Sequence, residues 1–196
     1  MIATVVRAGL SAAICVVVLA ACGPSPRTPI ADGPVVKPRA VLPPRPAEVR
    51  LDGLEPCSFV TFTLRQRLNG MRDAPHREAP ASAAPGFTCT YTNVPNLPSY
   101  GLTLRFLTVQ GADERLGASA VKVVTVDGFG AIQRPGLNDR EGRSCLLIVD
   151  VAQGQSLWAG FAETEFDTLT GGYQALCEKA TLAASSVLHE LRSRRR

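Results

Sequence analysis

The chain has 196 residues, of which 45% are hydrophobic and 19% charged, and its formal net charge is +4. The positive charge lies near the two ends, because residues 23–50 carry a net +3 and four arginines stand in the last five positions, whereas residues 51–191 carry −4. A nucleic-acid-binding domain concentrates basic residues on one folded surface, so this distribution argues against that class. About 146 residues, from 51 to 196, suit one globular domain.

The first 22 residues have the pattern of an export signal. Arg7 is followed by an apolar run over residues 8–21, interrupted only by Ser11, and the run ends in Leu19-Ala20-Ala21-Cys22. A charged start, a short apolar stretch and small residues at its end are typical of a secretory signal, and the stretch is shorter than the ~20 residues of a bilayer span. The last four residues resemble the lipobox of bacterial lipoproteins. We therefore expect residues 1–21 to be a signal peptide and Cys22 to carry a diacylglycerol that holds the exported protein on the cell membrane; the alternative is an ordinary secretory signal with a chance cysteine.

Residues 22–50 are expected to be the lipidated cysteine and a proline-rich tether. Eight prolines fall among small and charged residues between positions 23 and 50. Such a composition favours extended polyproline II structure and offers few apolar side chains for a core. The tether would reach on the order of 80–90 Å at ~3.1 Å per residue. Its positive charge either attracts anionic lipid heads or has no role beyond solubility.

The remaining cysteines predict disulfides. Four of them, Cys57, Cys89, Cys145 and Cys177, lie in the expected domain. An even number in an exported domain indicates two bridges, with three possible connectivities. We prefer Cys57–Cys89 and Cys145–Cys177, because each pair joins a predicted helix to a predicted strand of the same half. A zinc site is disfavoured because no two of these cysteines have the C-x-x-C spacing.

In chain order, the domain should begin with a helix over residues 54–69 and a polar loop over 72–86. Alternating residues predict strands over 87–94, 100–109 and 120–126, with a short helix or loop over 111–119 between the last two. Residues 127–144 are expected to connect to a buried strand over 145–152, which turns at Gln153-Gly154-Gln155 into a hairpin with 156–162. Apolar residues at intervals of three and four predict a long helix over 172–191. The predicted fold class is α+β: an antiparallel sheet of about five strands with an N-terminal and a long C-terminal helix packed on one face.

Short motifs in this domain resemble a known family. Pro56-Cys57 opens the first helix, Cys89-Thr90-Tyr91 lies on the first strand, Ser144-Cys145 begins another strand, and Leu176-Cys177 with Ala180 opens the last helix. With the lipobox and the tether, residues 50–191 look like the small lipoproteins of actinobacterial envelopes that are known only as a domain of unknown function. That resemblance implies the fold and the location, and it supplies no catalytic residues.

Few residues point to catalysis, and each has a simpler interpretation. Glu163, Glu165 and Asp167 would share one face of a strand, where paired carboxylates could serve glycoside hydrolysis or bind calcium. The solvent-exposed face of an edge strand is the more common reason for this pattern. His76 lies in the polar loop and His189 in the last helix, and both are expected to be solvated. Trp158 is expected either to pack in the hairpin or to contact a ligand.

No nucleophile motif and no metal-binding motif accompanies these residues. We therefore expect a lipid-anchored binding or interaction module of the cell envelope, without a cofactor, whose ligand is an envelope protein, a lipid or a small molecule. The alternatives are an envelope hydrolase that uses the acidic cluster (Glu163, Glu165 and Asp167) and a purely structural envelope lipoprotein.

Overall fold

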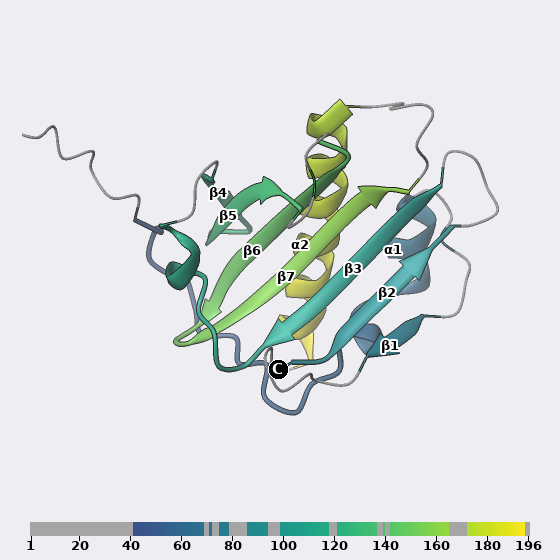
Figure 1. Cartoon of the computed structure of the whole chain (residues 1–196). Coiled ribbons are helices and arrows are strands. Elements are labelled where there is room, and N and C mark those ends of the chain that lie inside the picture. The colour runs from purple at the N-terminus through teal and green to yellow at the C-terminus, as the bar shows by residue number, and fades with distance from the viewer. Residues whose placement is uncertain are drawn as a thin grey trace, which may run out of the picture. The chain divides into compact units, whose positions relative to one another are not determined.

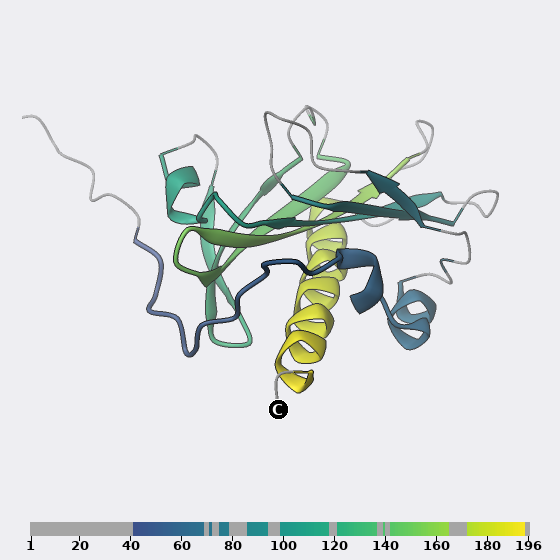
Figure 2. The ribbon, with the colours of Figure 1, turned by 90° about the horizontal axis from the view of Figure 1, so that it is seen from below.

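The domain is a single antiparallel sheet with helices on one face, as a computed structural model shows (Figures 1 and 2). The structure describes residues 41–68, 71, 75–78, 86–93, 99–117, 121–136, 139, 142–164 and 172–194. The predicted signal peptide, Cys22 and most of the predicted tether lie outside these residues.

The described residues form seven strands in the order β1-β2-β3-β7-β6-β5-β4. The strands are β1 (His76–Glu78), β2 (Thr88–Thr92), β3 (Tyr100–Leu107), β4 (Lys122–Val126), β5 (Phe129–Pro135), β6 (Ser144–Ala152) and β7 (Gln155–Glu163). The helical elements are η1 (Pro56–Phe59), α1 (Phe62–Arg67), η2 (Asp113–Arg115) and α2 (Gly172–Ser193). The α+β class, the antiparallel sheet and the long C-terminal helix are confirmed, and the strands outnumber the five expected.

Two strands are missing from the prediction: β1 lies inside the expected polar loop 72–86, and β5 lies inside the expected connection 127–144. Strand β5 pairs with β4 through a tight turn at Asp127 and Gly128, whose φ angles of 49° and 84° are both positive. Two such residues form the hairpin turn that matches the twist of a sheet, and an Asp-Gly pair is a common sequence for it. Glycine and proline within residues 129–135 weaken the alternation by which a strand is recognised.

The predicted N-terminal helix is two short pieces, η1 and α1. The chain is extended at Val60, and the hydroxyl of Thr61 accepts a hydrogen bond from the Leu64 amide at 3.1 Å. This contact is a new N-cap, so the β-branched residues interrupt the helix and start another one.

The main core lies between the sheet and α2. Figure 2 shows α2 crossing the face of the sheet on which α1 also lies. The helix side of the sheet presents large apolar residues, and the helix meets them with a stripe that includes Ala180, Ala183 and Ala184, all fully buried. Because alanine is small, the helix can lie close to strands that carry larger side chains.

Both preferred disulfides are present. Cys57 of η1 is bonded to Cys89 of β2, and Cys145 of β6 is bonded to Cys177 of α2, with Cα–Cα distances of 5.3 and 5.0 Å. Each bridge therefore ties a helical element to the sheet, as the sequence predicted.

The segment before residue 51 departs from the predicted boundary. Residues 41–50 belong to the same compact unit as the sheet, and Val49 is only 2% exposed in the main core. The Val49 amide donates a hydrogen bond to the Val151 carbonyl at 2.7 Å, and Leu51 donates to the Gln155 side chain at 2.7 Å. The expected tether was defined by its prolines, but its last ten residues also contain apolar side chains that pack on the domain.

An ion pair joins this segment to the sheet. The Arg45 guanidinium donates to the Asp150 carboxylate at 2.9 and 3.0 Å. Burial raises the pKa of Asp150 above its usual 3.8, while the hydrogen bond and charge of Arg45 act in the opposite direction. Arg45 thus offsets part of the cost of holding a carboxylate near the turn of the β6–β7 hairpin.

Candidate functional site

The face of the sheet opposite α2, which we call the second face, carries a different set of side chains. Successive side chains of a strand point to opposite faces of the sheet. The residues that alternate with the buried core residues of each strand therefore point to the second face. The cross-strand register aligns one row of them over five strands: Thr90 of β2, Thr103 of β3, Gly160 of β7, Leu146 of β6 and Arg134 of β5. Because the side chains in the middle of this row are small, the surface of the second face is recessed at its centre.

A hollow of about 360 Å³ lies over this row. Its lining includes Gly101, Thr103, Arg105, Leu146, Trp158 and Gly160. The volume falls within the range of small-molecule sites, and most of the lining is apolar, which is also typical of them.

Two glycines create the space. A Cβ atom built on Gly160 would lie 3.8 Å from Leu146 Cδ1 and 3.7 Å from the Thr103 carbonyl oxygen, and one on Gly101 would lie 3.6 Å from Thr164 Cγ2. These are ordinary van der Waals distances, so no steric clash forces glycine at either position. A larger side chain at these positions would instead occupy the hollow.

Trp158 forms one wall, and a chain of hydrogen bonds fixes it. Its indole Nε1 donates to Ser156 Oγ at 3.1 Å, and Ser156 Oγ donates to the Gln110 carbonyl at 2.8 Å. The Gln110 side chain in turn accepts a hydrogen bond from Arg115 at 2.9 Å. The polar atom of the indole is thereby satisfied while its ring stays beside the hollow. Trp158 is 5% exposed and also packs in a small apolar cluster with Leu107, Ile132 and Ile148.

Arg105 lies beside the same tryptophan. Its guanidinium carbon is 5.5 Å from the Trp158 ring centroid, and that of Arg115 is 5.4 Å away. The Nε atoms of both arginines are buried and have no hydrogen-bond partner in the structure. Within the described part of the chain, Arg105 forms no ion pair. A buried N–H without an acceptor is unusual in a folded protein, so the guanidinium of Arg105 retains unused donor capacity beside the hollow.

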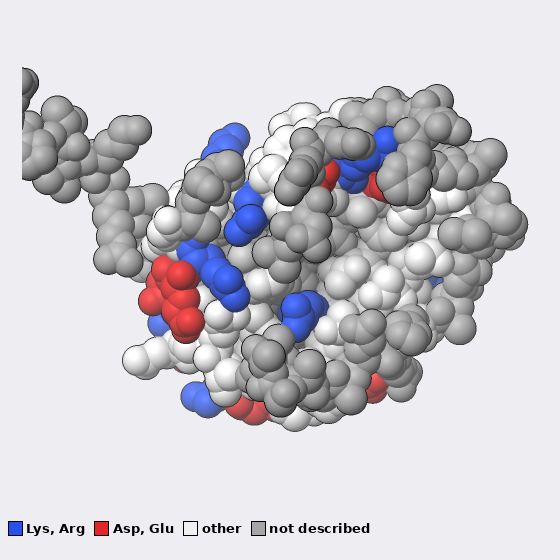
Figure 3. All heavy atoms as spheres, viewed as in Figure 1, with Lys and Arg blue, Asp and Glu red and all other residues white. Residues whose placement is uncertain are grey.

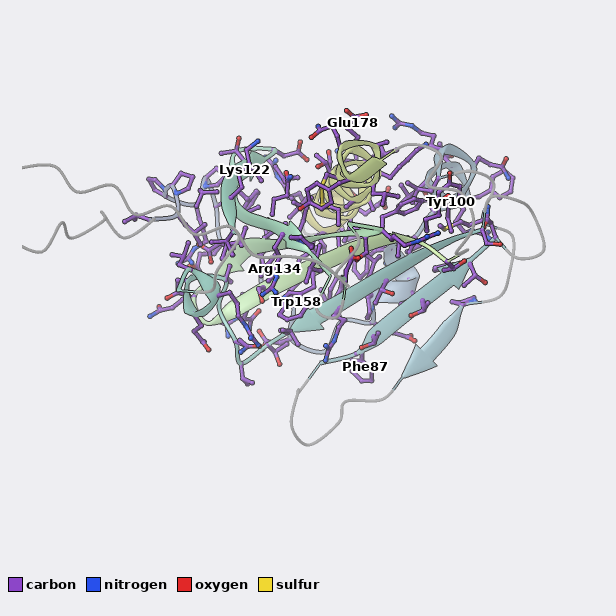
Figure 4. All side chains as sticks on the ribbon, turned by 45° about the horizontal axis from the view of Figure 1, so that its top comes forward. Phe87, Tyr100, Lys122, Arg134, Trp158 and Glu178 are labelled. Carbon is purple, nitrogen blue, oxygen red and sulfur yellow. A yellow bond between two sulfur atoms is a disulfide. The ribbon has the colours of Figure 1, made fainter. Side chains whose placement is uncertain are left out.

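The surface around the hollow is basic on the side of Trp158. Figure 3 shows blue side chains scattered over this part of the second face, with the red ones mainly at its margins. Figure 4 labels Arg134 of β5 and Trp158 of β7, which lie on two strands of the sheet with β6 between them. The opposite end holds a carboxylate, because Asp139 accepts hydrogen bonds from the Ser144 amide and hydroxyl at 2.7 and 2.8 Å.

The residues singled out from the sequence do not gather in this hollow, apart from Trp158. Glu163 is only 5% exposed at the end of β7, while Glu165 and Asp167 fall outside the described residues. His76 begins β1, and its side chain lies outside the described part of the structure. Among the described residues no group of histidine, cysteine, aspartate and glutamate side chains could hold a metal ion.

His189 lies in a second, more polar hollow of about 690 Å³ between α1 and α2. Ser185 and Asp127 are also there, and the serine hydroxyl donates directly to the Asp127 carboxylate at 2.8 Å. A nucleophilic serine needs a base such as histidine at its hydroxyl, and in the described part of the chain no such bond joins Ser185 to His189. This hollow therefore has the residue types of hydrolytic chemistry without their arrangement.

The sequence contained one sign of the first hollow. Trp158, Gly160 and Ala162 alternate along one strand, and Gly101, Thr103 and Arg105 alternate along another. Small residues at every second position mark a face that is not filled by a core. The sign is recognised only once the two strands are known to be neighbours, and so Arg105 and the glycines were not singled out.

The comparisons with known proteins identify a family and no activity. The family described as "Protein of unknown function (DUF3558)" matches residues 17–190, and the chain belongs to it. No curated protein and no solved structure matches the chain. None of the helices in the described residues is long and apolar enough to cross a membrane.

Proposed function

We propose that this member of a family of unknown function is a lipid-anchored binding module of the bacterial cell envelope, and that the hollow on its second face holds a small-molecule ligand. The observation that carries the binding proposal is the hollow itself. Glycines and a fixed tryptophan frame a mainly apolar space beside an arginine that forms no ion pair with any described residue. Ligand sites commonly combine an apolar lining with a few polar groups that set orientation.

The location rests on the sequence. The apolar run and the lipobox ending at Cys22 support export and lipid attachment, and the two disulfides suit an oxidising compartment. The resemblance to actinobacterial envelope lipoproteins supports the same location. Between Cys22 and the first described residue lie eighteen positions (23–40), enough chain to hold the domain away from the lipid surface.

The hydrolase alternative has less support. It needs at least two of Glu163, Glu165 and Asp167 on an accessible face, but the one whose surroundings are described is almost fully buried. A purely structural lipoprotein would not need the low centre of the second face. We therefore favour ligand binding over both.

We predict that Cys22→Ala abolishes lipid attachment and leaves the protein either unprocessed or released. The thioether at Cys22 is the proposed lipid bond, so the variant should lack the mass of the diacylglycerol, and it should either keep the signal peptide or leave the membrane fraction. Mass spectrometry of the protein recovered from membrane and aqueous fractions measures both effects, and Cys15→Ala is the matched control. A Cys22→Ala protein with the mass of the wild type would show that the lipoprotein assignment is wrong.

We predict that Gly160→Leu weakens ligand binding at least tenfold, a loss of about 1.4 kcal/mol. The leucine side chain would fill space over the central row that the glycine leaves empty. Octanol, octanoate and octylammonium serve as probes, because they share an apolar chain and differ in their head groups. Trp158 is the only tryptophan, so its emission reports binding directly.

The matched control is Gly117→Leu, because a Cβ atom at Gly117 meets nothing within 4 Å and the residue lies outside the lining. At least one probe should give a saturable change in the wild type and in Gly117→Leu, with much weaker binding to Gly160→Leu. If no probe binds the wild type, or if Gly160→Leu binds every probe as well as the wild type does, the hollow is not the binding site.

A further inference from the structure

We propose that the ligand of the hollow is a carboxylate amphiphile, a molecule with one carboxylate head and an apolar body, and that Arg105 binds the head. This inference rests on the proposed function and adds the chemical class of the ligand. It depends on three features of the described residues: the partners of Arg105, the charges around it and the polarity gradient along the hollow.

The first feature is the unused hydrogen-bonding capacity of Arg105. A guanidinium has five N–H donors in a planar fork that matches a carboxylate. Among the described residues Arg105 stacks on the Trp158 ring, and its Nε donor has no acceptor. Stacking on the ring fixes the plane of the group, so a carboxylate can be bound with little further loss of side-chain freedom.

The second feature is the sign of the surrounding charge. Arg115 lies against the same ring, and Arg134 stands next to Leu146 in the central row. Among the described side chains, the acidic group found near the lining is Asp139, which is at the other end and already accepts two hydrogen bonds from Ser144. The backbone register also places Glu78 of β1 in the row of Arg105, two strands away. An anionic head therefore gains from the field at the Trp158 end, while a cationic head is repelled there.

The third feature is the apolar floor. From Arg105 the hollow follows β3 through Thr103 to Gly101, a distance of about 13 Å at ~3.3 Å per residue. Leu146, Gly160 and Ala162 line this path on the neighbouring strands. A free inorganic anion would leave that apolar length unused, whereas an apolar body attached to the head would cover it.

The test compares the three probes on the chain from residue 23, which retains the whole compact unit from Pro38 to Arg196. Trp158 emission and titration calorimetry are both recorded, because a change at Arg105 also alters the surroundings of the tryptophan. In the wild type, octanoate should bind at least tenfold more tightly than octanol, and octylammonium should bind most weakly. The comparison needs no variant, so it stands even where a substitution disturbs folding.

Arg105→Met then removes the charge and keeps an apolar stem. We expect it to weaken octanoate at least tenfold and to leave octanol unchanged, while Arg105→Lys restores part of the octanoate affinity. Arg67→Met is the matched control. Arg67 is exposed on α1, so this substitution removes the same charge at a place away from the hollow.

Each outcome has a distinct meaning. Octanol binding as tightly as octanoate, or Arg105→Met weakening both probes equally, would overturn the carboxylate assignment and leave a binding site for neutral molecules. Failure of every probe to bind the wild type would overturn the proposed function itself. Tighter binding of octanoate that survives Arg105→Met but is lost in Arg67→Met would place the anion on the helix side and would also overturn the assignment.

Discussion

Replacing Cys145 and Cys177 together by alanine is expected to lower the free energy of unfolding by about 4 kcal/mol and the thermal midpoint by roughly 10 °C. The bridge closes a loop of 32 residues, and its removal returns the entropy of that loop to the unfolded chain. Both cysteines are buried where α2 lies on β6, so the helix also loses its covalent link to the sheet. Circular dichroism during heating measures the change.

The other bridge is the natural comparison. Cys57–Cys89 has the same separation of 32 residues, so loop entropy alone predicts the same loss for its double alanine variant. It ties down the short element η1 rather than the long helix. A midpoint within two degrees of the wild type for the Cys145→Ala, Cys177→Ala variant would show that packing of α2 makes the bridge redundant.

A chain that begins at residue 51 is expected to unfold some 5–10 °C below a chain that begins at residue 41. The shorter chain loses the buried Val49 side chain, worth about 1.5–3 kcal/mol, and the hydrogen bond from its amide to Val151. It also removes Arg45, the ion-pair partner of Asp150. Burial already raises the pKa of that carboxyl, so the loss of the favourable charge adds to the destabilisation. Thermal unfolding of the two chains in the same buffer gives the difference.

Val49→Ala in the longer chain separates these contributions, because it removes the apolar contact and retains Arg45 and the backbone hydrogen bond. We expect an intermediate midpoint. If the chains that begin at 41 and 51 unfold at the same temperature, residues 41–50 add no stability and the boundary predicted from the prolines is the better description of the domain.

The sequence was sufficient for those parts of the fold that depend on a repeated local pattern. The apolar stripe of α2 and the near-continuous apolar run of β6 are long enough to be recognised, and each places one cysteine, so the pairing of Cys145 with Cys177 followed. Local pattern was insufficient where few residues carry the signal. The helix expected over 54–69 is divided by a single capping contact at Thr61, and β5 is recognised only with its Asp127-Gly128 turn.

The segment before residue 51 shows a different reason for failure. Its prolines correctly indicate extended chain, but extended chain can also pack on a sheet, and composition does not distinguish the two. Leu42 and Pro43 lie against Gly130, where a Cβ atom would come within 2.9 Å of the proline ring. That contact depends on β5, which the sequence alone had not revealed.

The candidate site was the least predictable part. Its central row takes one residue from each of five strands, from Thr90 to Arg134, which are 44 positions apart in the chain. Threonine, glycine and leucine have no chemical signature of their own, and an isolated arginine on a strand is common. Trp158 was considered for ligand contact, but the partners that make it part of a site come from neighbouring strands.

The claim that the second face holds a carboxylate amphiphile is tested most directly by an amide chemical-shift titration of the ¹⁵N-labelled chain with octanoate. We predict saturable shifts at Thr103, Arg105 and Gly160, with Trp158 indole N–H shifting alongside them, and no comparable shifts along α2. Shifts confined to α1 and α2 around His189, or no saturable shifts at octanoate concentrations that change the Trp158 emission, would contradict the assignment of the hollow as the ligand site.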